Sequence, residues 1–181
     1  MKVVTGMVRF SYANVFEPKS INGSAPKYSV SLIIPKDDAA TLGKIRTAIE
    51  SAYTEGCSNG KLKAAGKTAP ALSAIHTPLR DGDSDRPDDP AYANSYFVNA
   101  NASRKPGVVD KNLNDILDPE ELMSGDYGRA SISFYAYNNS GNRGIACGLN
   151  HIQKLKTGEH FTGRTTAAGD FGSPDGEDIL L

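Results

Sequence analysis

Two alternating stretches joined by a turn-rich segment constrain this chain most, because together they predict a long β-hairpin. Residues 129–137 alternate strictly, with Ala, Ile and Phe on one side and Arg, Ser and Tyr on the other. A period of two is typical of a half-buried strand. Residues 138–144 are rich in Asn and Gly, which suit turns, and a second alternating run follows at 145–150. We therefore expect a hairpin within residues 129–155.

The predicted outer face of this hairpin carries Arg129, Tyr135 and Tyr137 among serines. Exposed aromatic rings beside a guanidinium form a platform on which unpaired bases stack. The two tyrosines also suit a packed position beneath a covering loop, because tyrosine is often partly buried. The hairpin alone therefore leaves two interpretations open, a stacking platform and a packed surface.

Alternation predicts three further strands, over residues 2–12, 27–34 and 95–103. Gly6 indicates a bulge or bend within the first of them. In that strand four residues share one side: Val4, Val8, Phe10 and Tyr12. Between the second and third strands, apolar residues at helical spacing predict one sizeable helix, which begins after an aspartate cap and ends at Gly56.

The remaining segments predict loops and a tail. Residues 69–93 combine prolines, glycine and acids with little periodicity, which is typical of a functional or a disordered segment. About five strands, one sizeable helix and long loops favour a mainly β fold, an OB-fold-like five-stranded barrel. We expect this domain to span residues 1–163, with a flexible acidic C-terminal tail at 164–181.

The charge distribution matters more than the net charge of −1. Four acids lie in the last dozen residues and five more lie between residues 81 and 89, so the rest of the chain is basic. Local charge patches govern binding more than the sum does. The sequence also contains no run of about 20 apolar residues, so no membrane partner is expected.

Motifs for catalysis are missing from the sequence. The run Asp81-Gly82-Asp83-Ser84-Asp85 suggests calcium, but Arg86 stands where an EF-hand loop needs glycine. A flexible acidic loop is the simpler interpretation. The three histidines lack zinc spacing, and the two cysteines, which lack CxxC spacing, are expected to be free thiols. We expect no enzyme, cofactor or metal site, although a carboxylate-based nuclease remains an alternative.

Three stretches carry a resemblance to a known family: GRASISFYAYNNSGNRGIACGLNHIQKL, KYSVSLIIPK and the closing GEDILL. They resemble a tailed-bacteriophage family, formerly uncharacterised, of OB-fold single-stranded-DNA-binding proteins. The resemblance covers nearly the whole chain. It implies sequence-independent binding of single-stranded DNA (ssDNA) in phage DNA replication, recombination or repair, in the cytoplasm of the infected bacterial host. It also implies recruitment of replication or recombination proteins by the acidic tail.

The candidate DNA-binding residues combine rings that stack bases, cations that meet phosphates and one amide for sugars or base edges. They are Arg9, Lys27, Phe97, Asn99, Arg104, Lys105, Arg129, Tyr135 and Tyr137. The expected partner-binding tail contains Asp175, Glu177, Asp178, Ile179, Leu180 and Leu181. Two alternative functions remain, a phage interaction or structural module without enzymatic activity and a metal-dependent nuclease.

Overall fold

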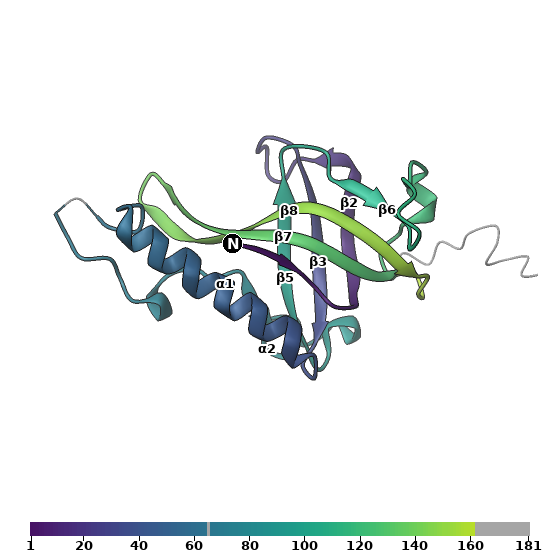
Figure 1. Cartoon of the computed structure of the whole chain (residues 1–181), viewed down its shortest axis with the longest axis horizontal. Helices are drawn as coiled ribbons and strands as arrows, with labels where there is room; N and C mark the ends of the chain where they lie inside the picture. The colour runs from purple at the N-terminus through teal and green to yellow at the C-terminus, as the bar shows by residue number, and fades with distance from the viewer. Residues whose placement is uncertain (65, 162–181) are drawn as a thin grey trace, which may run out of the picture.

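The protein is mainly β with one long helix, in a computed structural model that describes residues 1–64 and 66–161 (Figure 1). The strands are β1 (Lys2–Val4), β2 (Val8–Lys19), β3 (Lys27–Pro35), β4 (Leu79–Asp81), β5 (Ser95–Ala102), β6 (Gly107–Val109), β7 (Tyr127–Asn139) and β8 (Asn142–Lys156). The helices are α1 (Ala39–Ser58) and the short α2 (Gly82–Asp85), with 3-10 turns at η1 (Leu72–Ala74), η2 (Pro90–Tyr92) and η3 (Pro119–Glu121). The predicted fold class is confirmed, and the expected tail lies outside the described residues.

Five strands form a ring in the order β7, β2, β3, β5, β8 and back to β7. Neighbours run antiparallel except β5 and β8, which run parallel and meet at Asn101 and Gly148. Only short pairings join β5 to β8 and β2 to β7 among the described residues, so the ring is looser than a strict barrel. The three-residue strands β1, β4 and β6 extend it, and they are too short to produce a periodic signal in the sequence.

The predicted hairpin is confirmed as β7 and β8, whose facing residues include Tyr135 and Ala146. Its apolar residues point into the ring and its polar residues point outward, as the alternation predicts. The core therefore lies inside the ring and continues beneath α1, which packs on β7 and β1.

Helix α1 lies between β3 and β5, as expected, and begins with a side-chain cap. The Asp38 carboxylate accepts a hydrogen bond from the Thr41 N–H at 3.1 Å. The predicted end at Gly56 is wrong, because the helix continues to Ser58. A Cβ on Gly56 would lie 2.6 Å from the Cβ of Ala136 on β7. This glycine therefore allows the helix to approach the sheet rather than ending it.

The first predicted strand is two strands, because the chain turns at Gly6 between β1 and β2. Tyr12 was predicted to share a side with Phe10, and this is wrong. The pairing of β2 with β3 shifts register between Ser11 and Asn14, and Tyr12 has a left-handed φ of 47°. Such a bulge re-aims a side chain. Phe10 is buried, whereas Tyr12 is 58% exposed on the outer surface.

The irregular segment from η1 to η2 folds over the outer face of β3 and β5. Lys36 Nζ lies 2.9 Å from Asp81 Oδ1 and 2.6 Å from Asp83 Oδ2. These hydrogen bonds lower the pKa of both carboxyl groups and raise the pKa of the Lys36 ammonium. Arg80 and Asp85 form a further ion pair at 2.9 Å. The expectation of a flexible acidic loop is therefore wrong for this run of aspartates.

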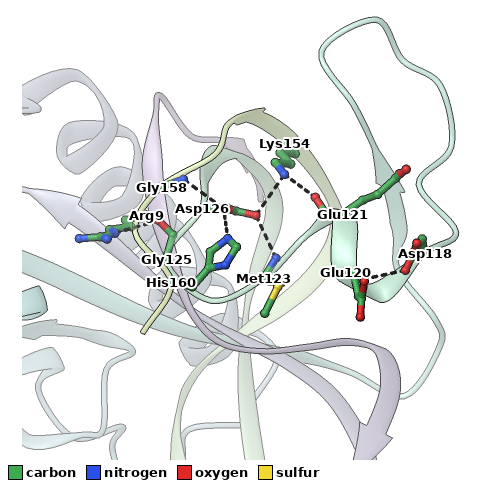
Figure 2. Close-up of polar contacts among 10 residues, drawn as sticks. All are labelled: Arg9, Asp118, Glu120, Glu121, Met123, Gly125, Asp126, Lys154, Gly158 and His160. Atoms are coloured by element: carbon green, nitrogen blue, oxygen red, sulfur yellow. Dashed lines mark hydrogen bonds and ion pairs between the residues drawn. The ribbon is translucent and has the colours of Figure 1, made fainter. Parts of the chain in front are cut away.

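A buried carboxylate closes the end of the barrel where the described chain ends (Figure 2). Asp126 accepts hydrogen bonds from the N–H groups of Met123 at 2.9 Å and Gly158 at 3.1 Å. It also lies 3.2 Å from Lys154 Nζ and 3.2 Å from His160 Nε2. The network therefore fixes the segment after β8 against the turn that precedes β7.

Candidate nucleic-acid interface

The outer face of β3 and β5 is polar and is hollowed into a groove of about 420 Å³. Alternation along β3 directs Ser29 outward, and Asn99 and Asn101 do the same on β5. Ser31 faces the same side, but it is buried and its hydroxyl accepts a hydrogen bond from the Tyr92 hydroxyl at 3.0 Å. The loop between β2 and β3 forms one wall. The floor of the groove thus presents the Ser29 hydroxyl and the amides of Asn99 and Asn101, which suit sugars and base edges, beside the apolar residues Val30 and Ala100.

The rim of this groove carries an aromatic ring and three cations. Tyr12 and Arg86 lie together, with the guanidinium carbon 5.8 Å from the centre of the tyrosine ring. The same guanidinium lies within 5.6 Å of the rings of Tyr92 and Phe97, so it is held among three aromatic side chains. Lys19 and Lys27 supply the other cations, and no carboxylate is found among the described residues that line the groove.

A second hollow of about 250 Å³ adjoins the first and shares Asn99 and Asn101 with it. Tyr137 and His76 line its far side. The chain at His76 lies close to β8 because Gly144 on that strand has no side chain. A Cβ on Gly144 would lie 2.8 Å from the His76 carbonyl oxygen and 2.9 Å from the Tyr137 hydroxyl. The two hollows therefore lie side by side across β5, with Asn99 and Asn101 common to both, and together they are called the depression across β5.

The structure brings three of the predicted site residues to this depression and places a fourth, Tyr135, on the same outer face. Lys27 and Asn99 line the first groove, and Tyr137 lines the second hollow beside Asn99. Tyr135 is 46% exposed on the same outer face. Its ring lies next to Gly148, the residue that pairs with Asn101 of β5. Both hairpin tyrosines thus lie on the outer surface rather than inside the apolar core.

Phe97 cannot serve as an open stacking surface, so its predicted role needs correction. Its alternation was interpreted correctly, since it shares a face with Asn99, but its ring is 0% exposed. Tyr92 packs edge-on against it, with ring centres 5.0 Å apart. The irregular segment before β5 covers this part of the face, and sequence periodicity carries no sign of such a cover.

Arg9 also has its guanidinium engaged within the protein. Its Nε donates to the Gly125 carbonyl at 2.9 Å and its Nη2 donates to the Glu159 carbonyl at 2.8 Å. The guanidinium stacks over Tyr127 and Phe161. Figure 2 shows Arg9 reaching Gly125 near the Asp126 network. These contacts indicate that Arg9 stabilises the end of the barrel.

The other predicted cations lie on the surface outside both hollows. Arg104 and Lys105 are exposed in the loop after β5, next to the pair formed by Tyr28 and Ala102. Arg129 is exposed on β7, where its Nε donates to the Gln153 side chain at 3.1 Å. The predicted tail residues, 175 and 177–181, lie outside the described residues.

Sequence reasoning missed Tyr12 and Arg86 of the groove rim, and it also missed Lys19. Tyr12 is turned outward by a bulge, and no glycine or proline in the sequence indicates that bulge. Arg86 lies among aspartates in a segment without periodicity. Its isolated positive charge in an acidic run was the one signal that could have drawn attention to it.

The described residues contain no arrangement that favours catalysis by a metal. Across 1–64 and 66–161, no group of three or more His, Cys, Asp or Glu side chains could hold a metal ion. Cys57 and Cys147 are free thiols, as predicted. Burial raises the pKa of the Cys147 thiol. Within the same ranges, no helix has the length and apolar character that crossing a membrane requires.

Solved structures with the same architecture include ssDNA-binding proteins of two phages. The ssDNA-binding protein from bacteriophage Enc34, in complex with ssDNA, superposes with a TM-score of 0.71 at 27% identity, over 88% of this chain and 89% of that chain. The ssDNA-binding protein gp2.5 of bacteriophage T7 superposes with a TM-score of 0.62 at 15% identity, over 91% of this chain and 97% of that chain. The T7 likeness supports the fold alone.

Sequence comparison agrees with the structural likeness. Protein p50 of Acyrthosiphon pisum secondary endosymbiont phage 1 is 29% identical over 174 residues, which is 93% of this chain and 90% of that protein. The family model described as "Enterobacter phage Enc34, ssDNA-binding protein" matches residues 1–181. The resemblance noted in the sequence is thereby confirmed, and the chain belongs to the Enc34 phage family of ssDNA-binding proteins.

Proposed function

We propose that this protein binds ssDNA without reading its sequence, on the outer face of β3 and β5. The observation that carries the proposal is the groove itself. In a chain of net charge −1, the described residues lining the groove include three cations, one exposed ring and no carboxylate. OB-fold proteins bind oligonucleotides on the face of their second and third strands and at adjoining loops. Here those strands of the ring are β3 and β5.

Each group has a distinct role in the proposal. Tyr12, Tyr135 and Tyr137 stack bases, which is tolerant of sequence because every base has a π-face. Lys19, Lys27 and Arg86 contact phosphates. Ser29, Asn99 and Asn101 contact sugars and base edges. The remaining surface cations contribute a longer-range attraction that guides the strand to the groove: Arg104, Lys105 and Arg129.

One gel-shift series with labelled single-stranded and double-stranded DNA, with and without EDTA, tests this function. We expect a shift of the single strand that is insensitive to EDTA and weakens as salt rises, because phosphate contacts release counterions. Degradation of the strand with magnesium or manganese would instead support a nuclease. No binding at any salt concentration would support an interaction or structural module.

The family relationship also supports a cellular role for the proposed binding. A protein that coats exposed strands serves phage DNA replication, recombination or repair in the cytoplasm of the infected host. We propose that the acidic tail recruits partner proteins through Asp175, Glu177 and Asp178 together with residues 179–181. Removal of residues 170–181 should abolish capture of a purified replication partner while ssDNA binding persists. Loss of ssDNA binding in the truncated protein would contradict this division of roles.

A further inference from the structure

Opposite ends of the molecule carry opposite charges. The loop from residue 59 to 68 contains Lys61, Lys63 and Lys67 and no acid. The segment from residue 110 to 121 contains five acids and one lysine. Figure 1 shows the first loop at the far left, beyond α1, and the second segment at the right, beside β6. The strand β5, which carries the proposed DNA face, lies between them.

Several charged side chains at both ends have no ion-pair partner in the part of the chain that the structure describes. Among the described residues, no carboxylate lies within ion-pair distance of Lys61, Lys63 or Lys67. The same pairs leave Glu120 and Glu121 without a cation. Figure 2 shows the carboxylates of both glutamates pointing away from the Asp126 network. Within residues 1–64 and 66–161, these three lysines and two glutamates therefore have no ion-pair partner.

The acidic end also exposes apolar surface. Leu113 is 71% exposed and Leu117 is 81% exposed, on either side of the buried Ile116. Next to the basic loop, Ala71 and Ala74 are exposed, whereas Ile75 is partly buried against the core. Exposed apolar side chains within a charged rim are typical of a surface that contacts another protein. The two ends thus complement each other in charge, and the acidic end adds exposed apolar surface for a contact.

We propose that a second copy of this chain docks its basic end on the acidic end of the first, so that copies line up head to tail along ssDNA. This contact is heterologous, and its repetition produces an open row rather than a closed dimer. A row suits a protein that coats a continuous strand, where cooperative binding is common. Because the proposed contact joins one loop to one short segment, we expect it to be small, to form on DNA and to leave the free protein monomeric.

Charge reversal at each end tests this inference, which rests on the proposed ssDNA binding. The variants are K61E/K63E, E120K/E121K and the combination of all four substitutions. Each is titrated against an oligo-dT of about 12 nucleotides, which holds one molecule, and another of about 70, which holds several. We expect wild-type protein to bind each site of the long strand about tenfold more tightly than the short one.

Both double variants should lose this advantage, although they change the net charge in opposite directions. The fourfold variant keeps the wild-type net charge and should recover the advantage. If the affinities instead follow net charge on both strands, or if the fourfold variant fails to recover, the head-to-tail contact is wrong. Wild-type protein that binds both lengths equally per site also overturns it, whereas failure to bind the short strand overturns the proposed function itself.

Discussion

Replacing Tyr12 by alanine should weaken ssDNA binding about tenfold without unfolding the protein. The ring is 58% exposed, and the Arg86 guanidinium lies 5.8 Å from its centre. One stacked base contributes about 1–3 kcal/mol, and each 1.4 kcal/mol changes affinity about tenfold. The free energy of unfolding should change by less than about 0.5 kcal/mol. Tyrosine and alanine bear a similar strain at a φ of 47°, and the lost ring is exposed.

Fluorescence anisotropy with labelled oligo-dT at fixed salt measures this effect, and thermal unfolding checks the fold. Tyr96→Ala is the matched control. Tyr96 is on β5 itself, but its ring lies near Lys36, which follows β3, and near Arg46 of α1. It lines neither hollow. Tyr12→Ala binding within about twofold of wild type would refute the stacking role. An equal loss in both variants would refute the placement of the site on this face.

Three further substitutions test separate parts of the account. Arg86→Ala should make the slope of log affinity against log salt shallower by about 0.7, because one phosphate contact is lost; an unchanged slope would remove Arg86 from the phosphate path. Phe97→Ala should lower the free energy of unfolding by about 3–5 kcal/mol in urea titration, because the ring is fully buried. Full stability in that variant would show that the ring is not packed. Gly56→Ala should destabilise by about 1–3 kcal/mol in the same assay, since its Cβ would lie 2.6 Å from that of Ala136; a neutral effect would mean that α1 shifts freely.

Regular alternation accounts for what the sequence predicts well. The hairpin of β7 and β8 follows from its period of two, and so does the outward direction of Tyr135, Asn99 and Lys27. Helix α1 follows from its apolar spacing and its aspartate cap. In each of these elements the same spacing recurs over many residues, so the sequence predicts the element whatever its tertiary contacts are.

The features that the sequence does not predict arise from single-residue irregularities and from segments distant in the chain that pack over a strand. One bulge turns Tyr12 from the side of Phe10 to the surface, and its left-handed φ has no glycine to mark it. Phe97 faces outward along its strand, but a segment without periodicity buries it beneath Tyr92. Arg9 is engaged by carbonyl groups far along the chain. Each depends on a tertiary contact that a local pattern does not encode.

The most direct test of the central claim is photocrosslinking to an oligo-dT that carries bromodeoxyuridine, with the attached peptides located by mass spectrometry. Bases that stack in the depression across β5 should crosslink to Tyr12 and to the hairpin tyrosines, Tyr135 and Tyr137. Excess unlabelled ssDNA should abolish these crosslinks. Crosslinks confined to α1 or to the loop from residue 59 to 68, with none on the outer face of the ring, would contradict the account.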